Sequence, residues 1–242
     1  DIAIGGILGS NIANILLVLG VSLLLIKNKS IDVISSKDIF VMLFATSLFC
    51  YFIYSGSIKE GWSLAMILSL PVYLYLSYKF FNKKNTDFDY NNNSSNLIIF
   101  INLLIGFFFL IYGSKLFING LIVISKFYGI QESVVGISLA AIGTSLPELS
   151  VTIAAFLRKE GSVALGNIVG SNIFNILGVL GLSTLLMGEI NFSNEFTGIN
   201  SIVLMASGIW ILYIAINKPN NTKLFGYISL FSYVFYTIFI YF

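Results

Sequence analysis

The segment AIGGILGSNIANILLVLGVSLLL (residues 3–25) occurs a second time as ALGNIVGSNIFNILGVLGLSTLL (residues 164–186), with 16 of 23 positions identical and no gap. A helical bilayer crossing takes about 20 apolar residues, so each copy is long enough to span a membrane. Both copies nevertheless carry Gly-Ser-Asn-Ile-x-Asn-Ile-Leu, whose serine and asparagines are costly in hydrocarbon. We therefore expect a duplicated membrane helix with a functional polar face.

The whole chain has the composition of a polytopic membrane protein. Its 242 residues are 57% apolar and 10% charged, against roughly 25% charged in soluble domains. The mean hydropathy of +0.92 agrees. The absence of histidine excludes imidazole-based zinc, haem and copper sites, and the single cysteine, Cys50, excludes an internal disulfide. We expect an all-α membrane protein that is not an enzyme and binds no nucleic acid and no resident cofactor.

Apolar runs bounded by charged and turn residues predict eight transmembrane helices. The linkers between them, taken alternately, place ten lysines and arginines on one side and two on the other, with Lys115 inside a span. Cytoplasmic loops carry the excess of lysine and arginine, so we expect the N-terminal end of this chain outside and the Asn-rich linker 82–96 in the cytoplasm. We expect the protein to lie in the cell (inner) membrane. The predicted spans are 2–26, 38–56, 61–81, 97–125, 130–157, 162–187, 196–216 and 224–242.

With eight spans, the two copies of the duplicated helix cross the membrane in opposite directions. Inverted repeats build many secondary transporters, which bind their substrates near the midplane between the repeats. Gly-x-x-x-Gly at Gly5 and Gly9, and at Gly166 and Gly170, is also a helix-packing motif. A duplicated packing helix is therefore the alternative interpretation.

Glu148 is the acid that lies deep inside a predicted span, and intramembrane acids usually mark ion pathways. Pro147 beside it is expected to kink or break the helix and to free backbone carbonyls. Helical spacing puts four residues on one stripe of this span, and it places two further polar pairs on the duplicated helices. The atoms with which these residues could bind a metal are all oxygens, which hard cations such as Ca²⁺ and Na⁺ prefer. The stripe is Ala141, Thr144, Ser145 and Glu148; the pairs are Ser171 with Asn175, and Ser10 with Asn14.

Three residues also have a structural interpretation. Glu148 could be protonated or paired with Lys115, and Asn14 and Asn175 could each hydrogen-bond between helices without binding an ion.

The segments GISLAAIGTSLPEL (residues 136–149) and GNIVGSNIFN (residues 166–175) resemble the second α-repeat of the cation/calcium exchanger superfamily, and residues 3–25 resemble the second helix of the first α-repeat. The resemblance implies a fold of two inverted five-helix halves. It divides this chain into 1–81, three helices of the first half; the linker 82–96; and 97–242, the five helices of the second half. On this resemblance we expect two further helices before Asp1, and with them a second carboxylate.

The resemblance also implies a metal site and an activity. Glu148 would be the bidentate Ca²⁺ ligand, with oxygens from Thr144, Ser145 and the Ala141 carbonyl. Ser171, Asn175, Ser10 and Asn14 would supply the others. The implied function is secondary active exchange of Ca²⁺ for Na⁺ or H⁺, with or without K⁺. Many exchangers of this family carry Asp where Asn175 stands, which leaves the coupling ion open. A cation channel and a membrane scaffold without transport activity are the alternatives, and the oligomeric state stays open.

Overall fold

The computed structural model describes residues 1–25, 36–158 and 160–242 except 82–95. The described chain consists of eight long helical segments, three of which contain a short π-helical stretch. Each predicted span coincides with one of these segments, with ends that differ by at most three residues. The segments are α1 (Ile2–Ala13), η1 (Asn14–Val18) and α2 (Leu19–Leu25); α3 (Ser36–Ser55); α4 (Glu60–Phe81); α5 (Asn96–Tyr128); α6 (Glu132–Val135), η2 (Gly136–Ala140) and α7 (Ala141–Leu157); α8 (Gly161–Ile173), η3 (Phe174–Leu180) and α9 (Gly181–Met187); α10 (Ile199–Asn217); and α11 (Thr222–Phe239).

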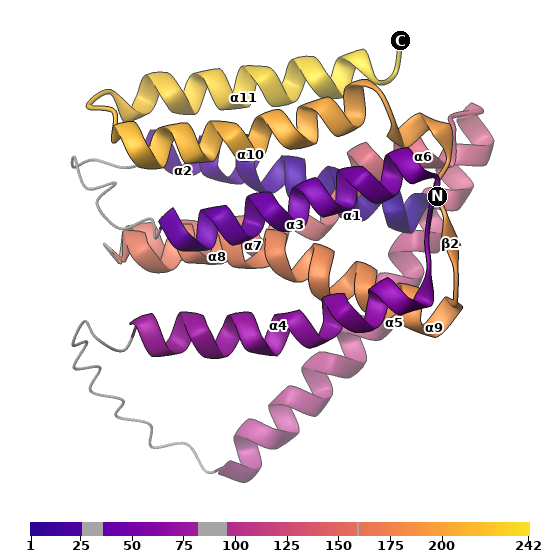
Figure 1. Cartoon of the computed structure of the whole chain (residues 1–242), viewed down its shortest axis with the longest axis horizontal. Coiled ribbons are helices and arrows are strands. Elements are labelled where there is room, and N and C mark those ends of the chain that lie inside the picture. Colours follow the sequence, from indigo (N-terminus) through magenta and orange to yellow (C-terminus); the bar gives the residue numbers. More distant parts are fainter. Residues whose placement is uncertain (26–35, 82–95, 159) are drawn as a thin grey trace.

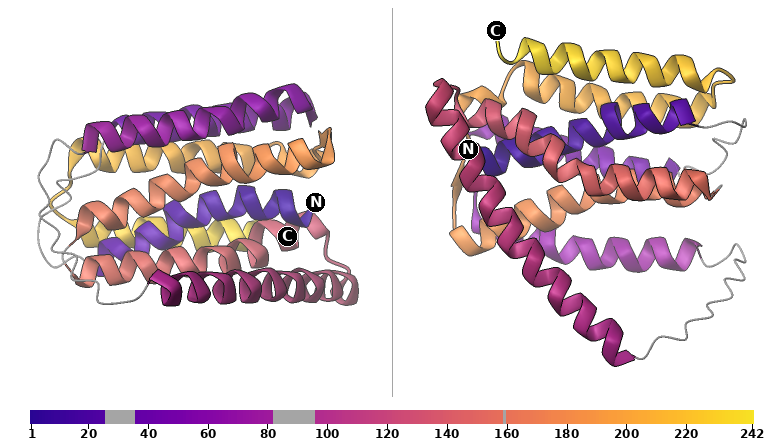
Figure 2. Two further views of the ribbon diagram at one scale, coloured as in Figure 1. Left: turned by 90° about the horizontal axis from the view of Figure 1, so that it is seen from below. Right: turned by 180° about the vertical axis from the view of Figure 1, so that it is seen from behind.

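The helical segments run back and forth between two ends of the molecule, and both chain termini lie at one end (Figure 1). Figure 2 shows α5 at the edge of the bundle, oblique to the other helices and diverging from them toward its N-terminal end. Six segments of the described chain are long and apolar enough to cross a bilayer. The other two predicted spans are α5, whose 33 residues measure about 50 Å, and α11, whose 18 residues measure about 27 Å. The protein is thus an all-α, multi-pass membrane protein.

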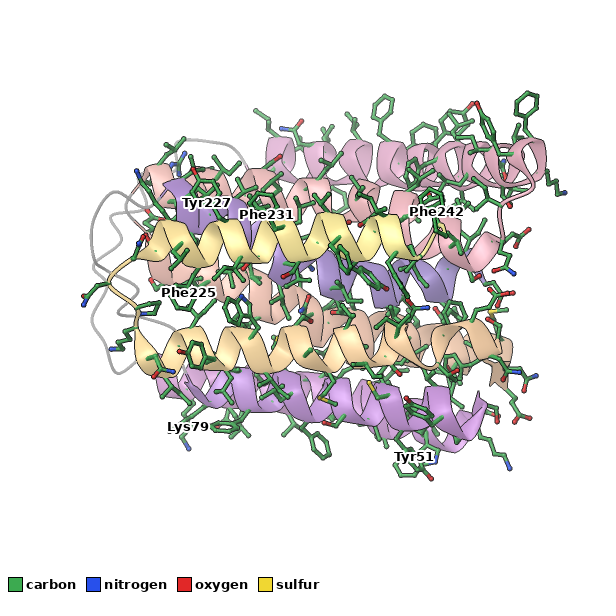
Figure 3. The ribbon with its side chains drawn as sticks, turned by 90° about the horizontal axis from the view of Figure 1, so that it is seen from above. Tyr51, Lys79, Phe225, Tyr227, Phe231 and Phe242 are labelled. Atoms are coloured by element: carbon green, nitrogen blue, oxygen red, sulfur yellow. The ribbon has the colours of Figure 1, made fainter. Side chains whose placement is uncertain are left out.

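The outer surface of the bundle is covered with large apolar and aromatic side chains (Figure 3). Phe231 on α11 is 72% exposed and Tyr51 on α3 is 60% exposed. Water would disfavour so much exposed apolar surface, whereas lipid chains solvate it well. This surface therefore fits a bilayer around the bundle.

The helical segment 2–25, which contains the first copy of the duplicated helix, lies in the centre of the bundle and is largely buried. Its glycines allow a close crossing with the segment 132–157. A Cβ at Gly9 would lie 2.2 Å from the Ile137 carbonyl oxygen, and one at Gly136 would lie 2.6 Å from the Ile2 carbonyl oxygen. At Gly166 and Gly170 of the second copy, a Cβ would meet no atom of the described chain within 4 Å. The packing motif therefore accounts for the first copy only.

The helix does not end at Pro147. Instead, α7 continues through this residue, and the irregular turn η2 lies earlier in the same segment. Of the two outcomes expected at Pro147, a kink or a break, the break was wrong, because a membrane helix can keep a proline when its neighbours support the turn that lacks a hydrogen bond. The other irregular turns follow the repeat: η1 begins at Asn14, and η3 contains Asn175, the equivalent residue of the second copy.

A short antiparallel strand pair, which the sequence did not predict, joins two loops at the end of the bundle where both termini lie. β1 (Ser57–Ile58) pairs with β2 (Ile190–Asn191), and Phe192 N donates to Gly56 O at 2.8 Å. A single 3₁₀ turn, η4 (Asn194–Phe196), follows before α10. The connections after α3 and after α9 are therefore fastened to each other.

Candidate functional site

The two copies of the duplicated helix run antiparallel and exchange hydrogen bonds through equivalent residues. Asn14 Nδ2 in η1 donates to Ser171 Oγ in α8 at 3.1 Å. In the other direction, Asn175 Nδ2 in η3 donates to Ser10 Oγ in α1, also at 3.1 Å. Asn14 and Asn175 occupy matching positions of the repeat, as do Ser10 and Ser171. The pair of contacts is thus close to two-fold symmetric, and it joins four of the predicted site residues.

A second chain of contacts lies beside this pair. Asn14 Nδ2 also donates to Asn172 Oδ1 at 3.0 Å, and Asn172 Nδ2 donates to the backbone carbonyl of Asn11 at 3.2 Å. All three asparagines are at most 1% exposed. Buried amides at membrane depth thus form a connected network rather than isolated polar groups.

The helix that carries the predicted stripe, α7, packs against both copies, since it contacts α1, η1 and α8. Within the stripe, Ala141 and Ser145 are buried, whereas Thr144 is exposed. Thr144 Oγ1 donates to the carbonyls of Ala140 and Ala141, at 2.9 and 3.1 Å. Ser145 is 1% exposed, and its hydroxyl oxygen has no hydrogen-bond partner in the described chain. Glu148 is half-buried, and its Oε2 is buried without a partner among the described residues.

Asn167, one turn before Ser171 on α8, hydrogen-bonds to the turn of α7 that contains Glu148. Its Nδ2 donates to the Glu148 carbonyl at 3.3 Å and to Thr152 Oγ1 at 3.1 Å. Thr152 is fully buried. These bonds fix the backbone of Glu148 relative to α8, while the carboxylate itself remains available.

Buried oxygens without a partner are concentrated in these helices. Removing such a group from water without a replacement partner costs about 1–3 kcal/mol, so most buried polar atoms are paired. Six buried side-chain atoms of the described chain have no partner, and four of them belong to the stripe or to the first repeat. Oxygens of this kind, from carboxylate, hydroxyl and amide groups, are the ligands that hard cations prefer. The four are Glu148 Oε2, Ser145 Oγ, Asn14 Oδ1 and Asn11 Oδ1.

The charge of the site is low. Within the described residues, no three His, Cys, Asp or Glu side chains come together as a metal-binding group. Glu148 is the carboxylate contributed by the predicted site residues, and the others supply hydroxyl, amide or carbonyl oxygens. Lys115 lies exposed on α5, and Glu148 Oε2 accepts no hydrogen bond from it. The structure thus gives no support to the alternative in which Glu148 is locked to a lysine.

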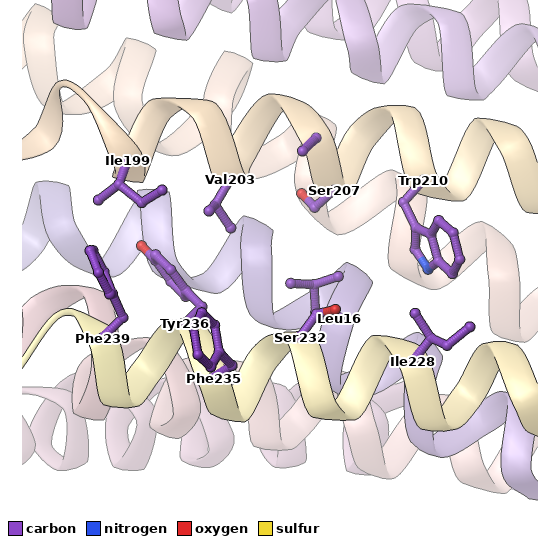
Figure 4. A pocket seen from close by; sticks show the side chains of 11 residues that line it. Leu16, Ile199, Val203, Ser207, Trp210, Ile228, Ser232, Phe235, Tyr236 and Phe239 are labelled. Atoms are coloured by element: carbon purple, nitrogen blue, oxygen red, sulfur yellow. The ribbon is translucent and has the colours of Figure 1, made fainter.

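A well-formed apolar groove lies away from these residues. A groove of about 450 Å³ runs between α10 and α11, with Leu16 of η1 also lining it (Figure 4). Its walls are almost wholly apolar and include Phe235, which is 72% exposed. A cation stripped of water would find no charged oxygen there, so this groove is not the ion site.

The structure therefore brings Asn14 into contact with Ser171 and Asn175 into contact with Ser10, and it packs α7 against the helices that carry them. Thr144 of the predicted stripe lies exposed. Sequence reasoning missed Asn11, Asn167 and Asn172. Two of these could have been found, because Asn11 and Asn172 are the same residue of the repeated motif and are identical in both copies. Asn167 has Gly6 as its counterpart in the first copy, so the repeat gave no such signal for it.

Comparison with known proteins gives one consistent family. A family model described as sodium/calcium exchanger protein matches residues 1–79 and 98–242. CaxA of Alkalimonas amylolytica is 32% identical, covering 89% of this chain and 70% of CaxA. The sodium/calcium exchanger MaX1 of Methanosarcina acetivorans is 30% identical, covering 76% of this chain and 64% of MaX1. A solved structure of a sodium/calcium exchanger from Methanococcus jannaschii is 29% identical, with a TM-score of 0.65, covering 97% of this chain and 74% of that protein.

Proposed function

Since the chain belongs to the sodium/calcium exchanger family, a family of cation/Ca²⁺ antiporters, we propose that it exchanges Ca²⁺ for Na⁺ across the inner membrane of the cell. The observation that carries the proposal is the set of buried oxygens without partners on α1, η1 and α7, which includes Glu148 Oε2, on helices that pack together where the two antiparallel copies of one helix meet. Ca²⁺ and Na⁺ are cargo, bound with most of their water removed. No covalent step is involved.

The ligands we propose are the residues that the sequence and the contacts place on these helices. Glu148 supplies the negative charge, and Ser145, Thr144 and the Ala141 carbonyl supply neutral oxygens from α7. Ser10 and Asn14 act from the first repeat, and Ser171 and Asn175 from the second. Oxygen ligands drawn from several helices suit Ca²⁺, which takes six to eight of them in flexible geometry.

Competition for Glu148 explains why the exchange is coupled. The carboxylate can balance part of the charge of one Ca²⁺, of Na⁺ ions or of a proton, but it cannot serve all of them together. A charged group at the bilayer centre costs at least about 2.5 kcal/mol, so a site carried across without a cation is disfavoured. Alternating access between two inverted repeats then moves occupied sites in both directions and suppresses leak.

The orientation in the membrane follows from the basic residues. We propose that the N-terminal end of this chain lies outside and that the linker 82–96 lies in the cytoplasm, because the ten-to-two distribution of lysine and arginine favours this orientation. Residues 1–81 then belong to one inverted half and residues 97–242 to the other.

The test is uptake of ⁴⁵Ca²⁺ into proteoliposomes loaded with Na⁺ and diluted into choline buffer at constant pH. We expect uptake that requires internal Na⁺ and stops when the Na⁺ gradient is removed. Uptake driven by a pH gradient alone would replace Na⁺ by H⁺ as the coupling ion, and a requirement for K⁺ would add a third ion. Ca²⁺ flux without any counter-ion would identify a channel. Absence of both flux and Ca²⁺ binding would favour the scaffold.

A further inference from the structure

The side-chain amide of Asn14 has a fixed orientation in this structure. An asparagine NH₂ group has two protons to donate, while its oxygen can only accept. Both donors of Asn14 are engaged, one with Ser171 Oγ and one with Asn172 Oδ1. Asn14 is fully buried, and its Oδ1 has no partner among the described residues. The amide therefore presents an unpaired oxygen and no free N–H.

The orientation of Asn172 is fixed in turn by a group that cannot reverse its role. Asn172 Nδ2 donates to the backbone carbonyl of Asn11, and a carbonyl can only accept. If the Asn172 amide were turned over, its oxygen would face that carbonyl and its NH₂ would face the NH₂ of Asn14. Both contacts would then be repulsive. One backbone carbonyl thus sets the polarity of two buried amides in series.

The second repeat lacks this arrangement. Asn11, the counterpart of Asn172, donates its Nδ2 to the Ile7 carbonyl of its own helix at 2.8 Å. Asn175, the counterpart of Asn14, donates to Ser10 Oγ, and its side chain is only partly buried. The orientation of the amide oxygen is therefore fixed only at Asn14, in the first repeat, and the residue that fixes it is Asn172 of the second repeat.

We propose that Asn172 is a positioning residue for cation binding: it holds the Asn14 amide so that Oδ1, and never Nδ2, faces the bound ion. The inference rests on the proposed function of this site and adds to it a residue outside the ligand set. An amide N–H pointing at a cation repels it, whereas an amide oxygen coordinates it. Residues that orient metal ligands typically contribute 10- to 100-fold to affinity.

The test is a double-mutant cycle on equilibrium ⁴⁵Ca²⁺ binding by the purified protein in detergent, with Asn172→Ala, Asn14→Ala and the double variant. We expect Asn172→Ala to weaken Ca²⁺ binding about tenfold while Asn14 is present, and to have no further effect in the Asn14→Ala background. Equal weakening in both backgrounds would mean that Asn172 supports the fold rather than Asn14, and unchanged affinity in the single variant would equally overturn the inference.

Two further variants keep the test decisive. Asn172→Ser retains a buried hydroxyl that can donate or accept, so it supports folding without fixing the amide; we expect weakening in the same direction that again depends on Asn14. Thr184→Ala removes a fully buried hydroxyl bonded to the Leu180 carbonyl of the same helical segment, and we expect unchanged affinity. If the unmodified protein binds no Ca²⁺, the proposed function fails. If it binds Ca²⁺ and Asn172→Ser binds equally well, only the inference on Asn172 fails.

Discussion

Asn14 in the first repeat donates a hydrogen bond to Ser171 in the second, and the equivalent residues make the reverse contact at the same distance of 3.1 Å. The two copies of the repeated helix therefore contact each other through the serine and asparagine residues that ordinary membrane helices lack. A hydrogen bond between membrane helices contributes only about 0.6 kcal/mol on average. Such small stabilisation does not explain why buried oxygens beside these bonds are left without partners. The cation binding that we propose would give these oxygens a partner.

The close crossing of the first repeat and the α6–α7 segment predicts a sharp difference between two neighbouring glycines. In Gly9→Ala the new Cβ would meet the Ile137 carbonyl at 2.2 Å, so the helices must separate. We expect loss of about 1–3 kcal/mol of stability, seen as a lower melting temperature in detergent. The control is Gly6→Ala, whose Cβ would lie at an ordinary 3.7 Å from Ala140 Cβ. Equal melting temperatures for the two variants would contradict the described packing.

Asn175 carries a neutral amide, so we predict that a negative charge at this position increases Ca²⁺ affinity. Ca²⁺ affinity rises with the number of charged ligands, and Asn175→Asp would add a carboxylate of nearly the same shape. We expect Ca²⁺ to bind about tenfold more tightly and more Na⁺ to be needed to displace it. Binding of ⁴⁵Ca²⁺ with Na⁺ competition measures both. The matched control, Asn217→Asp at the exposed end of α10, should change neither; unaltered binding in Asn175→Asp would remove this residue from the site.

The two bonds of Asn167 predict that it supports the acidic turn without binding the ion itself. In Asn167→Ala, the Glu148 carbonyl and the Thr152 hydroxyl both lose a donor. We expect a lower melting temperature, and Ca²⁺ binding weakened severalfold because Glu148 is less firmly held. Calorimetric titration and thermal melting of one sample separate the two effects. An unchanged melting temperature together with unchanged Ca²⁺ affinity would show that the hydrogen bonds of Asn167 contribute neither to stability nor to Ca²⁺ binding.

The sequence predicted the helices well because each span is a long apolar run bounded by charge. The repeat predicted that Ser10, Asn14, Ser171 and Asn175 contribute to one site, but not that they would hydrogen-bond in pairs from one copy to the other. The sequence did not predict that α7 continues through Pro147, because neighbouring helices decide whether that turn survives. It did not reveal the hydrogen bonds of Asn172 to Asn14 and to the Asn11 carbonyl, because helical spacing assigns a residue to a face but does not show which partner takes its hydrogen bonds.

The polar contacts of Asn167 and the β1–β2 pair were missed for a related reason. Asn167 is bonded to α7 through the Glu148 backbone carbonyl and the Thr152 hydroxyl, and its counterpart in the first copy is a glycine, so the repeat does not mark it. The strand pair joins residues 57–58 to residues 190–191, a long-range contact between two ordinary loops. Local sequence contains no signal for either contact.

The most direct measurement is equilibrium ⁴⁵Ca²⁺ binding to the purified protein, compared with Glu148→Gln and with Glu132→Gln as a control that removes an exposed carboxylate at the end of the same helical segment. Our account predicts saturable, Na⁺-displaceable binding in the wild type and the control, and a loss of at least 100-fold in affinity in Glu148→Gln. Binding by Glu148→Gln with unchanged affinity would contradict the account, because the buried carboxylate would then not hold the ion.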